Sequence, residues 1–154
     1  MIRLVSSVIG RILLSSIFII AGLSKLLHWE PSISYLIDAC AKGHIIYNSS
    51  IVDVALTTIS DHAQVFMVLA TICELLGGCL VLLGLFTRFG SLLLILFLIP
   101  TTFIFHAFWG MEGAQAEIEL SAFMKNLAIT GGLLVVYAFG SGFSGIGRKS
   151  ISDD

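Results

Sequence analysis

Four apolar stretches, each about as long as a bilayer is thick, constrain this chain more than any other feature of its sequence. They cover about residues 4–27, 63–86, 89–108 and 121–140. A helix needs about 20 mainly apolar residues to cross the hydrocarbon core. Of the 154 residues, 57% are hydrophobic and only 12% are charged, whereas soluble domains are about 25% charged. The sequence therefore predicts an all-α integral membrane four-helix bundle, formed by a single domain over residues 1–154.

The first stretch has an alternative interpretation as a cleaved signal peptide. Arg3 and Arg11 resemble a basic leading region, and an apolar run follows them. However, Ala21-Gly22-Leu23 is a poor cleavage site, and Lys25 follows it closely. We therefore interpret residues 4–27 as a retained span.

The basic residues of the connections predict an orientation. Arg3 precedes the first span, Arg88 lies between the second and third spans, and Arg148 and Lys149 follow the fourth. The two long connections, residues 28–62 and 109–120, are mainly acidic. Because cytoplasmic connections are enriched in Lys and Arg, we expect both termini in the cytoplasm.

The long first connection on the outer side predicts a short amphipathic helix. Pro31 is suited to a helix start and Gly43 to a helix end. Apolar residues recur between them at helical spacing, at Ile33, Leu36, Ile37 and Cys40. We expect this helix to lie at the outer interface and to cover the end of the bundle.

Glu74 is the one charged residue between Val65 and Thr87. A carboxylate at membrane depth must be paired, protonated or hydrated. At 1.5 Å per residue, Glu74 lies about 18 Å and Arg11 about 10 Å from the cytoplasmic side. An arginine side chain can span much of that difference. The sequence therefore predicts a buried ion pair between Arg11 and Glu74.

A second polar cluster is expected nearer the outer side. Thr102, His106 and Trp109 are spaced to share one helical face. Lys25, Lys125 and Asn126 have a similar depth at the ends of their spans. We predict that these six residues form a ligand-binding pocket mouth. Alternatively, Lys25, Lys125 and Trp109 are ordinary interface anchors, and His106 is a polar group with its own partner.

Small residues predict close helix packing at Gly22, Gly77, Gly78 and Gly132, because they allow helix backbones to approach. The three cysteines and four histidines show no metal-binding spacing. Cys73 and Cys79 are too far apart along one helix to form a disulfide. We therefore expect no metal site and no covalently bound cofactor. Nothing in the sequence is typical of nucleic-acid binding.

Four segments in order resemble the DoxX family of small bacterial membrane proteins. They span about residues 10–140, and the matching patterns are Arg11…Phe18…Ala21-Gly22…Lys25-Leu26, Glu74-x-x-Gly77-Gly78…Gly84-Leu85-Phe86-Thr87-Arg88, His106-Ala107-Phe108-Trp109 and Phe123-x-Lys125-Asn126-Leu127-Ala128…Gly131-Gly132. The resemblance implies a four-helix bundle in the bacterial cytoplasmic (inner) membrane. It also implies a link to redox chemistry, because relatives include quinone-linked thiosulfate oxidoreductase subunits. It carries no catalytic residue onto this chain.

Three functions are compatible with these features. The first is a membrane subunit of a redox assembly that binds a quinone or a similar lipid-soluble ligand in the outer polar pocket. Its partners would be the lipid bilayer, other subunits of the assembly and, in an oligomer, further copies of the chain. The second is a structural or partner-binding bundle whose buried charges specify helix register. The third is a small-solute or proton pathway that uses Glu74.

Overall fold

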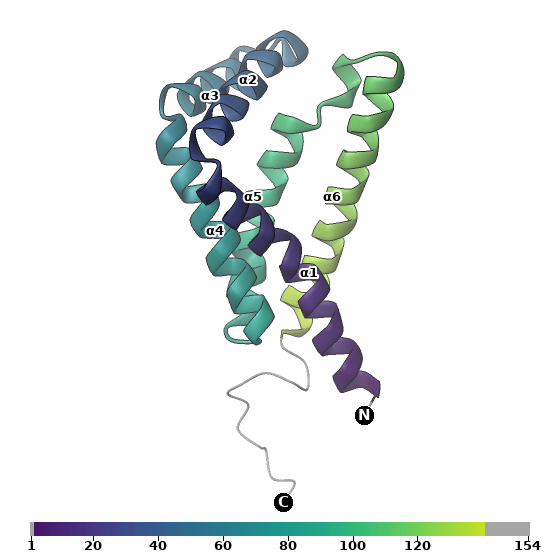
Figure 1. Cartoon of the computed structure of the whole chain (residues 1–154). Coiled ribbons are helices and arrows are strands. Elements are labelled where there is room, and N and C mark those ends of the chain that lie inside the picture. The colour runs from purple at the N-terminus through teal and green to yellow at the C-terminus, as the bar shows by residue number, and fades with distance from the viewer. Residues whose placement is uncertain (1, 141–154) are drawn as a thin grey trace, which may run out of the picture.

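The computed structural model describes residues 2–140, which are almost entirely helical (Figure 1). The helices, in chain order, are α1 (Ile2–Leu27), α2 (Trp29–Tyr47), α3 (Ser50–Asp61), α4 (Ala63–Leu83), α5 (Thr87–Phe105), the 3-10 helix η1 (Phe108–Gly110) and α6 (Gly113–Phe139). Four segments are long and apolar enough to cross a membrane: Leu4–Leu27, Ala63–Leu83, Thr87–Gly110 and Gly113–Phe139. The predicted all-helical chain with four candidate spans is confirmed. The basic residues Arg148 and Lys149 lie outside the described residues.

Two predicted span boundaries are wrong. Helix α4 ends at Leu83 rather than at residue 86, because Gly84 and Phe86 adopt left-handed backbone conformations and turn the chain. Helix α6 begins at Gly113 rather than at residue 121. The acidic residues Glu117 and Glu119 had marked this region as a connection. Both residues lie beyond the first turn of α6, which holds no acidic side chain. Within the helix, Gln115 donates to Glu119 four residues further along, and such a pair supports the helical state.

The first long connection contains two helices instead of one. Helix α2 continues past Gly43 to Tyr47, and the left-handed residue Asn48 then turns the chain into α3. Gly43 does not end the helix. It is a packing position, because a Cβ atom there would lie 2.7 Å from Cδ1 of Leu56 on α3. The expected apolar face is largely buried at Ile33, Leu36 and Cys40, whereas Ile37 is exposed.

Helices α2 and α3 pack as a pair over the ends of α4 and α5 (Figure 1). The buried residues of this contact are Ile33, Leu36, Cys40, Leu56, Ala63 and Met67. Burial also raises the pKa of the Cys40 thiol. The two short helices therefore form a fixed cover at one end of the spans.

The spans have their own core, which lies below that cover. It consists of Phe18, Val81, Leu94, Ile95, Leu98 and Leu133, from α1, α4, α5 and α6. Helix α4 is central to the arrangement, since it packs against both α1 and α5. Helix α6 contacts mainly α5 and is largely exposed on its other faces.

Glycines allow the helices to approach closely where α4 crosses α1 and where it crosses α5. A Cβ atom on Gly22 would lie 2.8 Å from the Leu75 side chain, and one on Gly78 would lie 2.8 Å from Ile19. These positions bring α1 against α4. On the other side of α4, a Cβ atom on Gly77 would lie 3.0 Å from the backbone oxygen of Gly90 on α5. Gly132 has looser surroundings, with Leu14 at 3.5 Å.

Candidate functional site

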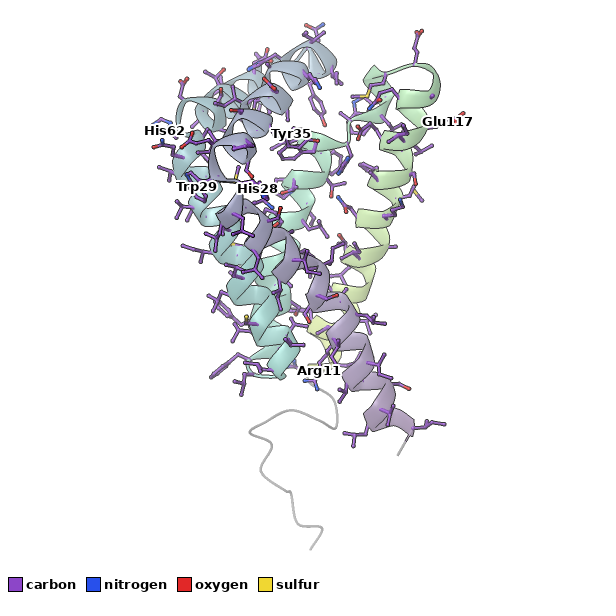
Figure 2. All side chains as sticks on the ribbon, viewed as in Figure 1. Arg11, His28, Trp29, Tyr35, His62 and Glu117 are labelled. Carbon is purple, nitrogen blue, oxygen red and sulfur yellow. The ribbon has the colours of Figure 1, made fainter. Side chains whose placement is uncertain are left out.

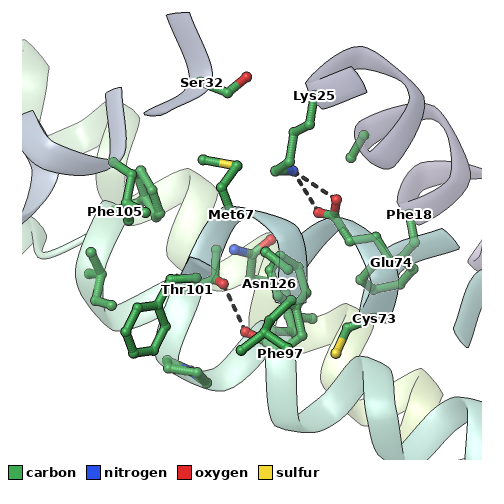
Figure 3. Close-up of a pocket in the computed structure, with 18 of the residues that line it drawn as sticks. Phe18, Lys25, Ser32, Met67, Cys73, Glu74, Phe97, Thr101, Phe105 and Asn126 are labelled. Atoms are coloured by element: carbon green, nitrogen blue, oxygen red, sulfur yellow. Dashed lines mark hydrogen bonds and ion pairs between the residues drawn. The ribbon is translucent and has the colours of Figure 1, made fainter. Parts of the chain in front are cut away.

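An ion pair inside the bundle joins α1 to α4. The Nζ atom of Lys25 donates to both carboxylate oxygens of Glu74, at 2.7 Å and 2.9 Å (Figure 3). The Glu74 side chain is only 3% exposed, and that of Lys25 is 24% exposed. The Lys25 ammonium also lies 5.8 Å from the centre of the Phe97 ring. The costly buried carboxylate is therefore neutralised by a lysine from the neighbouring span.

The predicted pairing of Glu74 with Arg11 is wrong. Helix α1 passes Glu74 at Gly22, whose Cβ position would lie 3.4 Å from the Glu74 Cβ atom. Lys25 is one helical turn from this crossing, whereas Arg11 is 11 residues away, or about 16 Å along the helix axis. Figure 2 shows Arg11 far along α1 from His28 and Trp29, toward the other end of the bundle. Arg11 is buried there, at 6% exposure.

A cavity of about 720 Å³ opens beside the Lys25–Glu74 pair (Figure 3). Its wall comes from α1, α2, α3, α4, α5 and α6 and is mostly apolar, with Phe18, Met67, Phe97 and Phe105 among its residues. Its polar residues are Ser24, Lys25, Ser32, Tyr35, Glu74, Thr101, His106 and Asn126. Cavities of 300–1,000 Å³ with a few polar groups in an apolar wall are typical small-molecule sites.

Three of the six residues predicted for the outer pocket line this cavity: Lys25, His106 and Asn126. The other three do not. Thr102 is buried, and its hydroxyl donates to the backbone oxygen of Leu98. Lys125 is exposed. The helical face expected to join Thr102, His106 and Trp109 is interrupted, because α5 ends at Phe105.

Trp109 belongs to an aromatic cluster between α5, η1 and α6. Its ring lies 5.1 Å from Phe108, 5.7 Å from Tyr47 and 5.9 Å from Phe123, measured between ring centres. These pairs meet edge to face, which is a favourable geometry for aromatic rings. Trp109 therefore connects Tyr47 at the end of α2 with Phe123 of α6.

His106 has a carboxylate partner that the sequence did not indicate. Its Nδ1 atom lies 2.8 Å from Oε2 of Glu119 on α6, and Gln115 donates to the other carboxylate oxygen of Glu119 at 3.0 Å. The His106 side chain is 23% exposed and that of Glu119 16%. His106 lies in the short non-helical segment between α5 and η1, where it faces both the cavity and α6.

Other cavity residues were also missed. Phe97, Thr101 and Tyr35 line the cavity, and the Tyr35 ring stacks on Phe105 with ring centres 5.0 Å apart. Phe97 and Thr101 are one turn apart on α5, which a helical-face argument could have found. Tyr35 could not be found in this way, because its position depends on how α2 folds back over the spans.

No group of three or more His, Cys, Asp or Glu side chains suited to a metal ion occurs within residues 2–140. The three thiols in this range are unpaired: Cys40 is buried, Cys73 lines the cavity, and Cys79 is exposed. The cavity wall offers hydrogen-bonding groups, an ion pair, a free thiol and apolar surface.

The four candidate spans and the cavity between the helices define a small multi-span membrane protein with a space for a ligand. The DoxX family model matches residues 6–107, and the chain belongs to the DoxX family. It is also similar to the inner membrane protein YphA of Escherichia coli (strain K12), with 26% identity over 147 residues, or 96% of this chain and 91% of YphA. No solved structure matches the chain.

Proposed function

We propose that the chain binds a quinone or a similar lipid-soluble ring compound in the cavity and serves as the membrane subunit of a redox assembly. The observation that carries this proposal is the Lys25–Glu74 pair in the wall of an apolar cavity of about 720 Å³ within the spans. An apolar ring and tail would fit the wall, while the polar residues would hold the head group. Such a ligand can enter from the bilayer.

The polar residues offer the hydrogen-bond donors that a quinone carbonyl requires. A lysine ammonium carries three N–H groups, and Lys25 directs its bonds to Glu74 alone, which leaves donor capacity toward the cavity. The Asn126 side-chain amide forms no hydrogen bond to another residue within 2–140. It therefore has two N–H donors for a ligand. The phenylalanine rings of the wall supply faces for stacking.

Titration of the purified chain in lipid nanodiscs tests this function. We expect a short-tailed benzoquinone or naphthoquinone to quench the fluorescence of the two tryptophans saturably. Asn126→Leu should weaken binding about tenfold, the effect of losing one hydrogen bond of about 1.4 kcal/mol, and His106→Ala should do the same at about pH 5, where a histidine is protonated and donates to a carbonyl. His62→Ala is the matched control, because His62 is exposed and lies outside the cavity, and it should bind as the wild type does.

Absence of saturable binding in both the wild type and His106→Ala would contradict the proposal. Co-purification of a protein partner without any ligand would then favour the structural, partner-binding function. Proton or solute flux through liposomes that Glu74→Gln abolishes would instead favour a pathway.

We also propose a location in the bacterial cytoplasmic membrane with both termini in the cytoplasm. The start of α1, the turn at Arg88 and the end of α6 lie at one end of the bundle, and α2 and α3 lie at the other (Figure 1). Arg88 also donates to the backbone oxygen of Ala138 near the end of α6. Arg88 therefore lies on the side that faces the cytoplasm in this orientation. The name of YphA supports the inner membrane.

Reporter fusions check this orientation. Alkaline phosphatase fused after Asp154 should be inactive, and green fluorescent protein at the same position should fluoresce. Alkaline phosphatase fused after Asn48, between α2 and α3, should be active. The reverse pattern would overturn the proposed orientation.

A further inference from the structure

A second cavity of about 300 Å³ lies next to the main one, between α2 and the start of α6. The two cavities share Tyr35, Ile104 and Phe105, which therefore form the wall between them. Lys42 and Gln115 are exposed and border the second cavity. In the proposed orientation, this smaller cavity is a solvent-connected vestibule on the outer side.

The hydrogen bond between His106 and Glu119 crosses this wall. His106 lines the main cavity, and Glu119 lines the vestibule. Their side chains meet at 2.8 Å, and neither is more than a quarter exposed. Gln115 holds the second carboxylate oxygen of Glu119 and thereby fixes its orientation. A titratable pair thus connects the space proposed for the ligand with the outer solvent.

The partner of each ring nitrogen determines what His106 can do. An ionised carboxylate only accepts hydrogen bonds, so neutral His106 carries its proton on Nδ1 and donates it to Glu119. Nε2 then keeps its lone pair and is the ring nitrogen left for a ligand in the main cavity. A carboxylate in this position also stabilises the imidazolium form, as the carboxylate of a catalytic triad does.

We propose that His106 and Glu119 form a proton-exchanging dyad that connects the bound ligand with the outer vestibule. Neutral His106 accepts a hydrogen bond from a ligand hydroxyl at Nε2, and protonated His106 donates one to a ligand carbonyl. The proton that His106 gains or loses passes through Nδ1 and Glu119 to the vestibule. This inference rests on the proposed function, and it assigns Glu119 as a positioning residue that acts through His106.

Several other ionisable groups surround the dyad. Tyr35 and Lys42 of α2 border the vestibule, and Lys25 of α1 and Glu74 of α4 face the main cavity. Partial burial raises the pKa of Tyr35, and the negative charge of Glu119 raises it further. The Glu119 carboxylate thus acts electrostatically on the groups around this wall. A pH response that belongs to the dyad must therefore be separated from one that arises at Lys25 and Glu74.

The test measures the affinity of decylubiquinol and of decylubiquinone for the nanodisc-reconstituted chain between about pH 8 and about pH 5, where histidine changes charge. As the pH falls, quinol affinity should decrease about tenfold, because Nε2 is then protonated and accepts no hydrogen bond. Quinone affinity should not decrease. In Glu119→Gln, the pH profile of quinol affinity should differ from that of the wild type, because the carboxylate that accepts from Nδ1 of His106 is replaced by a neutral amide.

Two further variants complete the experiment. His106→Ala should abolish the pH dependence, and a dependence that persists would assign it to Lys25 and Glu74 and overturn the dyad. Glu117→Gln is the matched control, because Glu117 is exposed on the face of α6 that points away from the other helices (Figure 2). This variant should keep the wild-type pH profile. Binding without pH dependence, or a Glu119→Gln profile identical to the wild type, overturns the dyad alone. Failure of both ligands to bind overturns the proposed function and the dyad together.

Discussion

Replacing Lys25 by Met, or Glu74 by Gln, is expected to destabilise the folded chain by about 3–5 kcal/mol, because either change leaves a buried polar group without its partner. Replacing both should cost much less than the sum of the two single changes. The pair lies where α1 crosses α4, and Glu74 is only 3% exposed. Equilibrium unfolding in mixed detergent and SDS micelles gives the free energies of all four chains in this double-mutant cycle.

The matched control cycle uses Arg11→Met with Glu74→Gln. Arg11 lies on the same helix as Lys25 and is also buried, but it lies about 16 Å from the α1–Glu74 crossing. Its effect should therefore add to that of Glu74→Gln within about 0.5 kcal/mol. Strong coupling of Arg11 to Glu74, together with additivity of Lys25 and Glu74, would contradict the observed pairing.

Gly77→Val is expected to destabilise the chain on the order of 3 kcal/mol, because overpacking at a close helix contact forces the helices apart. A Cβ atom at Gly77 would lie 2.8 Å from Cγ of Leu94 and 3.0 Å from the backbone oxygen of Gly90. The leucine can change rotamer, whereas the backbone oxygen moves only with α5. Unfolding in the same micelles measures the loss.

Gly131→Val controls for the effect of a β-branched residue in a spanning helix. Gly131 is helical and exposed, and a Cβ atom there meets nothing within 4 Å. This variant should therefore change the free energy of unfolding by less than about 1 kcal/mol, because its Cβ meets no neighbour and valine is a slightly better helix former than glycine. Equal losses at Gly77 and Gly131 would show that the α4–α5 crossing does not depend on a glycine.

The four spans could be predicted from the sequence because membrane insertion selects for length and hydropathy, which are local properties. The second helix of the outer cover was missed because its packing depends on contacts that are not local in the sequence. Helix α3 has apolar residues at several positions, but Ile51 and Val54 are exposed and only Leu56 is buried, so its sequence does not mark the face that packs. Its burial depends on Gly43 of α2, and no local pattern predicts that contact.

Lys25 and Glu74 could each be singled out from the sequence, but their pairing could not. Both carry charge within or beside an apolar run, which marks them individually. The partner depends on where α1 crosses α4, and depth along each helix gives that position only within about two turns. Gly22 marks the position of the crossing, because it packs beside Glu74 and lies one helical turn from Lys25.

The contact between Glu119 and His106 was missed because a helix boundary was predicted wrongly. Residues 109–120 were interpreted as a connection, so Glu119 counted only as an acidic residue of a loop. Once α6 is extended to Gly113, Glu119 lies on a helix that faces the end of α5, where His106 follows the last turn. A wrong helix start therefore concealed a functional candidate.

We propose that the cavity beside the Lys25–Glu74 pair is the site of a lipid-soluble ring ligand. Photolabelling of the reconstituted chain with an azidoquinone, followed by mass spectrometry of the labelled peptides, tests this site. Labels are expected on the cavity-lining residues between 17 and 25 and between 93 and 106, and excess unlabelled quinone should suppress them. Labels that this competitor does not reduce, or that fall mainly on the exposed face of α6 around Leu134 and Val135, would contradict it.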